Sequence, residues 1–72
     1  MNGATSPLVM KHALDEDGRS HLVAVIDEGQ KLIRISTTSE GKETGGITLP
    51  LRVDILRFLK DLLVVLGEIV RE

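Results

Sequence analysis

The chain has 72 residues, of which 42% are hydrophobic and 28% are charged, and this length suffices for one small domain. It contains no cysteine, which excludes disulfide bonds, thiolate metal sites and cysteine nucleophiles. Nine Lys and Arg residues against eleven Asp and Glu residues give a net charge of −2, which excludes a uniformly basic nucleic-acid-binding protein but allows a basic patch. A chain this short buries only about 60% of its unfolded surface, so we expect oligomerisation to complete its core.

The N-terminal residues do not have the pattern of a targeting signal. Residues 1–7 are small and polar, and we expect them to form a disordered tail before a single domain of residues 8–72. Apolar runs such as residues 62–66 are far shorter than the roughly 20 residues that cross a bilayer. We therefore expect a cytoplasmic protein without membrane contact.

The first half of the domain predicts three β-strands. Residues 8–14 are mostly apolar, residues 21–26 are rich in β-branched side chains, and residues 31–38 alternate between apolar and polar positions. Turns are expected at residues 15–20 and 27–30, which contain acidic side chains and a glycine each.

The second half predicts a short strand and a long helix. Residues 39–46 contain three glycines and alternating charges, which is typical of a flexible loop. Residues 47–49 form a brief fourth strand that Pro50 ends, and residues 51–70 have the periodicity of one helix. This order predicts an α+β fold, in which a curved four-stranded antiparallel sheet is followed by one C-terminal helix that covers one of its faces.

The predicted helix is apolar over roughly half of its circumference, whereas a surface helix needs an apolar arc of only about 100°. We expect one of two adjacent stripes to pack on the sheet and the other on the same helix of a second chain. A strongly curved sheet that covers both stripes within a monomer is the alternative, and the assignment of stripes to surfaces stays open. The candidate dimer interface is the stripe Ile55, Phe58, Leu62, Val65 and Ile69, and the other stripe is Leu56, Leu59, Leu63, Leu66 and Val70.

No combination of residues predicts catalysis or a metal site. The two histidines, His12 and His21, have no partner at metal-ligand spacing, and the acidic turn between the first two strands lacks the alternating ligands of a calcium loop. The hydroxyls of residues 36–39 lack a nucleophile elbow, and Gly45-Gly46 lacks the rest of a phosphate-binding loop. We expect a protein that is not an enzyme and uses no cofactor.

One face of the predicted sheet is a candidate ligand-binding surface. If the helix covers Ile33 and Ile35, the alternate residues of that strand point to the opposite side. Guanidinium, ammonium and hydroxyl groups there suit a phosphate backbone, and the alternative is an ordinary solvated sheet face. The candidate nucleic-acid-binding residues are Lys11, Lys31, Arg34, Ser36, Thr38 and Lys42, with His21 and Arg19 nearby.

Three segments resemble single-stranded nucleic-acid-binding proteins of the PUR-domain and positive-cofactor-four transcriptional coactivator type. They are residues 31–38 (KLIRISTT), 46–50 (GITLP) and 56–59 (LRFL), within a similarity over about residues 21–66. The resemblance implies a dimer of ββββα chains whose curved sheets hold single-stranded DNA or RNA.

The resemblance also implies roles for particular residues. It places Arg34, Ser36 and Thr38 on the strand that faces the nucleic acid, and Lys42 near the path of its backbone. Proteins of this type usually stack bases on aromatic side chains. The single aromatic residue of this chain, Phe58, belongs instead to the predicted helix.

Two functions follow as hypotheses. The first is a homodimeric single-stranded nucleic-acid-binding protein with a role in transcription or in the nucleoid, held by phosphate contacts and therefore sensitive to salt. The second is a dimeric scaffold of the same fold that engages a protein partner. We favour the first, for either DNA or RNA.

Overall fold

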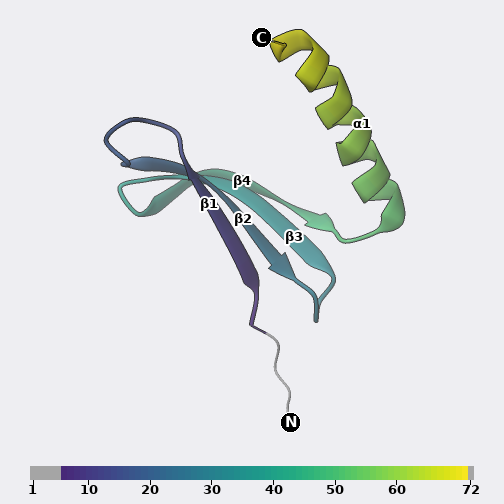
Figure 1. Cartoon of the computed structure of the whole chain (residues 1–72). Helices are drawn as coiled ribbons and strands as arrows, with labels where there is room; N and C mark the ends of the chain where they lie inside the picture. The colour runs from purple at the N-terminus through teal and green to yellow at the C-terminus, as the bar shows by residue number, and fades with distance from the viewer. Residues whose placement is uncertain (1–5, 72) are drawn as a thin grey trace.

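The computed structural model describes residues 6–71, so most of the tail expected at residues 1–7 lies outside the described residues. Within this range, four strands are followed by one helix (Figure 1). The strands form one curved, open antiparallel sheet in the order β1-β2-β3-β4, which confirms the predicted α+β ββββα fold. The elements are β1 (Leu8–Ala13), β2 (Ser20–Asp27), β3 (Leu32–Ser39), β4 (Lys42–Pro50) and α1 (Val53–Val70).

The prediction of a flexible loop at residues 39–46 is wrong, because most of this segment belongs to β4. Glu40 and Gly41 form a two-residue turn between β3 and β4, with φ angles of 53° and 83°. Two successive residues with positive φ give a hairpin turn whose twist matches that of the strands it joins. Glycine adopts this conformation without the steric cost that a Cβ atom brings. The glycines and charges that suggested a loop therefore mark a tight turn and an exposed edge strand.

A β-bulge at Thr44 sets the two faces of β4. The register pairs Thr38 with Glu43. The next pair is Thr37 with Gly45, so Thr44 is an extra residue of β4. The Oγ1 atom of Thr44 lies 2.8 Å from Thr37 Oγ1 and donates a hydrogen bond of 3.2 Å to the Thr37 carbonyl oxygen. Because side chains alternate along a strand, one extra residue moves every later side chain of β4 to the opposite face.

The sheet has two faces of different character, which follow from its register and from the alternation of side chains. The face that carries Arg34, here called the polar face, also holds most of the charged and hydroxyl groups of the sheet. The opposite face, here called the apolar face, is made mainly of aliphatic side chains. The polar face includes Lys11, His21, Val23, Val25, Arg34, Ser36, Thr38, Glu43 and Thr48, and the apolar face includes Leu8, Met10, Leu22, Ala24, Ile26, Ile33, Ile35, Ile47 and Leu49.

The helix leaves both faces of the sheet largely uncovered. It begins at Val53, two residues later than predicted, and extends away from the sheet (Figure 1). Within α1 no residue is buried, and only Ile55 and Leu59 are half-buried. Among residues 6–71, the buried apolar side chains are Val23 and Ile33 alone. The expectation that the helix covers one face of the sheet is therefore not met within a single chain, and each apolar stripe contributes one half-buried residue.

Candidate nucleic-acid interface

Four of the six predicted site residues lie on the polar face. They are Lys11, Arg34, Ser36 and Thr38. Lys11 is exposed on the edge strand β1, while Arg34 and Thr38 are half-buried on β3. Ser36 is buried, with only 6% of its surface exposed, because it lies in an inner strand between paired neighbours on β2 and β4. Its hydroxyl is therefore a poor candidate for contact with a ligand.

The other two predicted residues, Lys31 and Lys42, lie at opposite ends of β3. Lys31 is in the turn before this strand and has a φ of 58°, and Lys42 pairs with Ser39 at its far end. The eight residues of β3 between them correspond to about 26 Å of extended chain. Lys42 pairs with Ser39, whose side chain lies on the face opposite Arg34 and Thr38. Lys42 therefore also lies on the face opposite Arg34. These two lysines therefore do not join Arg34 in one cluster.

Arg34 is held against β4 by both ends of its guanidinium group. Its Nη1 atom donates a hydrogen bond of 2.8 Å to Thr48 Oγ1. Its Nε atom donates a hydrogen bond of 3.2 Å to Glu43 Oε2, and its Nη2 atom donates to Glu43 Oε1. This two-point contact between a guanidinium and a carboxylate is among the most directional ion pairs in proteins. Each of the three guanidinium nitrogen atoms of Arg34 thus donates one hydrogen bond to β4.

Gly46 provides the space in which the guanidinium group lies. A Cβ atom at this position would be 2.8 Å from Arg34 Nη2 and 3.2 Å from Arg34 Cζ. It would also lie 2.9 Å from Ser36 Cβ. These distances are shorter than the roughly 3.5–4.0 Å at which non-bonded carbon atoms pack. The absence of a side chain at Gly46 therefore lets Arg34 cross β4 close to its backbone.

The contact with Glu43 changes the titration of both groups. The hydrogen bond from Arg34 lowers the pKa of Glu43, and the same hydrogen bond raises the pKa of Arg34. Their side chains remain 40% and 45% exposed, so water screens the pair and its contribution to stability is small. Its main effect is local, because it neutralises the charge of Arg34 and fixes the direction of its side chain.

Glu43, Gly46 and Thr48 are not among the site residues that the sequence predicts. Glu43 and Thr48 are separated by an odd number of positions, which in a regular strand puts two side chains on opposite faces. Only the bulge brings both to the polar face. The one available signal was Glu40-Gly41, since a two-residue turn that ends in glycine is typical of a hairpin.

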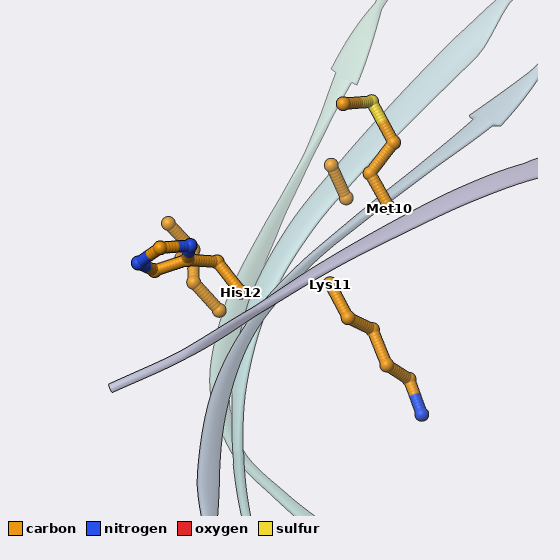
Figure 2. Close-up of a pocket in the computed structure, with 5 residues that line it drawn as sticks. Met10, Lys11 and His12 are labelled. Atoms are coloured by element: carbon orange, nitrogen blue, oxygen red, sulfur yellow. The ribbon is translucent and has the colours of Figure 1, made fainter. Parts of the chain in front are cut away.

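The apolar face contains a shallow hollow next to the edge strand β1 (Figure 2). Its volume is about 290 Å³, and Figure 2 shows Met10 and His12 on one side of β1 and Lys11 on the other. His12 therefore belongs to the apolar face, whereas Lys11 extends toward the polar face. The hollow is lined by Met10, His12, Leu22 and Ala24 of the apolar face, and also by Lys11, although its side chain leaves β1 on the other side.

Replacing Arg34 with alanine should raise the pKa of Glu43 toward its ordinary value, because the guanidinium stabilises the ionised carboxylate. Since the pKa is lowered in the folded chain, the contact is complete above the ordinary range of glutamate and is lost as the pH falls through the lowered pKa. A carbon NMR titration of the Glu43 carboxyl group measures the change. A Lys60→Ala chain, altered on the helix, is the control and should titrate like the wild type. Equal midpoints in the wild-type and Arg34→Ala chains would contradict the ion pair.

Within residues 6–71, no group of three or more potential ligand side chains could hold a metal ion. In the same range, no helix is long and apolar enough to cross a membrane. Comparisons with protein-family models, with curated proteins and with solved structures find no match. The resemblance to the PUR-domain and positive-cofactor-four type therefore stays a prediction.

Proposed function

We propose that this chain forms a homodimer that binds single-stranded nucleic acid on the polar face of its sheet, in transcription or in the nucleoid. The observation that carries the proposal is the openness of this face, which α1, the one helix among the described residues, does not cover. Ammonium, guanidinium and hydroxyl groups are the usual partners of phosphate and sugar oxygens. An open sheet surface suits an extended single strand, whose bases are not hidden in a duplex.

Lys11 is the side chain of the polar face best suited to bind a phosphate group. It is exposed, and among the described residues it forms no ion pair. Arg34, in contrast, is already paired with Glu43. A lysine ammonium is a compact charge that binds phosphate without a fixed geometry. We therefore assign the first phosphate contact to Lys11, at the exposed edge of the sheet.

The surface of the helix supports the homodimer in this proposal. Phe58, Leu63 and Ile69 expose 64%, 68% and 73% of their surface. The radius of gyration of the chain is 14.5 Å, whereas a compact domain of this length has one of about 11 Å. Exposed apolar area of this extent is typical of an interaction surface. A second copy carries the same apolar surface, so that two copies related by a twofold axis are able to cover one another.

A Phe58→Asp chain should dissociate into monomers, because a carboxylate in an apolar interface is desolvated without a partner. We expect its dimer dissociation constant to rise about tenfold or more. Sedimentation equilibrium over a range of protein concentrations measures this constant. Lys60→Asp introduces the same side chain on the opposite side of the helix, and it should leave the dimer unchanged. A wild-type chain that is monomeric at all accessible concentrations would overturn the homodimer.

A Lys11→Ala chain should bind a labelled single strand of about 20 nucleotides more weakly and with less dependence on salt. One lost phosphate contact lowers the slope of log affinity against log salt by about 0.7 for a single strand. Fluorescence anisotropy at several salt concentrations measures both quantities. Lys42→Ala removes the same charge away from the polar face and should have a smaller effect. Absence of wild-type binding even at low salt would reject the nucleic-acid function and favour the protein scaffold.

A further inference from the structure

We propose that the outer face of the Arg34 guanidinium group is a stacking platform for one nucleobase of the bound strand. This inference rests on the proposed function, because it requires a single strand on the polar face. It assigns to Arg34 a role different from neutralising a phosphate. The observations that support this role are the contacts that Glu43, Thr48 and Gly46 make with the guanidinium group.

Three of the five N–H bonds of the guanidinium group are already occupied. Its N–H bonds lie in one plane, and its three nitrogen atoms donate to Glu43 and Thr48. The edge formed by Nε and Nη2, which is able to bind a phosphate at two points, is bound to the Glu43 carboxylate. A phosphate would have to displace this carboxylate and leave it facing the negative strand. These hydrogen bonds leave the two flat faces of the group free, together with one N–H bond each on Nη1 and Nη2.

We infer that Gly46 covers one of these faces and that the other is open. Gly46 lies against the guanidinium group, as the short distances from its missing Cβ position to Nη2 and Cζ indicate. The Arg34 side chain is nevertheless 40% exposed, and the neighbouring residues of β4 from Lys42 to Thr48 are exposed as well. Gly45 and Gly46 carry no side chain that would rise beside the plane. The outward face is therefore accessible to a flat ligand.

A nucleobase is the part of a nucleic acid that fits such a surface. Bases splayed from a single strand stack on aromatic rings and on arginine guanidinium planes. The chain has no tyrosine or tryptophan, and its one phenylalanine, Phe58, lies on α1. A stacked base contacts the flat face of Arg34 and not its N–H bonds, which lie in the plane, so Arg34 reads no hydrogen-bond pattern on the base. We expect binding with little sequence preference.

The test compares two labelled single strands with the same phosphate backbone, one carrying bases and one abasic throughout. Arg34→Lys keeps the positive charge but removes the plane. It should weaken binding of the base-containing strand by about five- to a hundredfold and leave binding of the abasic strand within about twofold. Arg57→Lys, the same substitution on the exposed helix, is the matched control and should change neither affinity. Circular dichroism and thermal melting confirm that each variant is folded.

The outcomes separate this inference from the function on which it rests. If the wild-type chain binds neither strand at low salt, the proposed function fails and the platform fails with it. If the wild-type chain binds both strands equally, or Arg34→Lys weakens both by the same factor, the platform is wrong and the nucleic-acid function stands.

A second variant keeps the test independent of the folding of Arg34→Lys. Glu43→Gln removes the charge that neutralises Arg34 and leaves the arginine in place. The glutamine side chain keeps one acceptor but no charge, so Arg34 should bind phosphate more readily, and affinity for the abasic strand and its salt dependence should both rise. The preference for the base-containing strand should fall at least severalfold. An unchanged ratio between the two strands would show that Glu43 does not hold a platform and would overturn the inference.

Discussion

The single extra residue at Thr44 decides which side chains of β4 meet Arg34. Without it, Ile47 would lie opposite Arg34 on the polar face. With it, Ile47 pairs with Ile35 on the apolar face, and Thr48 pairs with Arg34. The bulge therefore sorts aliphatic from polar side chains and at the same time builds the hydrogen-bonded support of the guanidinium group. A local irregularity of one strand thus determines the chemistry of a whole face.

The same sorting supports the proposed homodimer. Aliphatic side chains gather on the apolar face and on α1, yet only Val23 and Ile33 are buried among the apolar residues described. Burying a large aliphatic or aromatic side chain contributes about 1.5–3 kcal/mol to stability. Phe58 and similar residues are exposed in the single chain, so their burial in a dimer would stabilise it. An arrangement in which helices cover one another would leave the opposite, polar face free for a ligand. Dimerisation and binding would then use different surfaces of one small fold.

The sequence predicts the elements well where periodicity is regular and fails where geometry is irregular. Alternation and β-branching place the first three strands, and the apolar pattern places the helix to within two residues at its start. The predicted loop fails because the glycines of β4 serve a tight turn and a close approach of Arg34. Glu43 could not be assigned to Arg34, because a bulge has no reliable signature in composition. The burial of Ser36 likewise depends on the register of three strands, which the sequence of one strand does not contain.

A nuclear Overhauser measurement on the Arg34 side chain tests the central claim most directly, because it needs no ligand. With the bulge at Thr44, Arg34 Nε lies beside the side chain of Glu43 and Arg34 Nη1 lies beside the side chain of Thr48. Cross-peaks between Arg34 and both residues are therefore the predicted result. Cross-peaks from Arg34 to the Ile47 methyl groups, without those to Thr48, would mean a regular β4 and would contradict the arrangement on which the proposed interface depends.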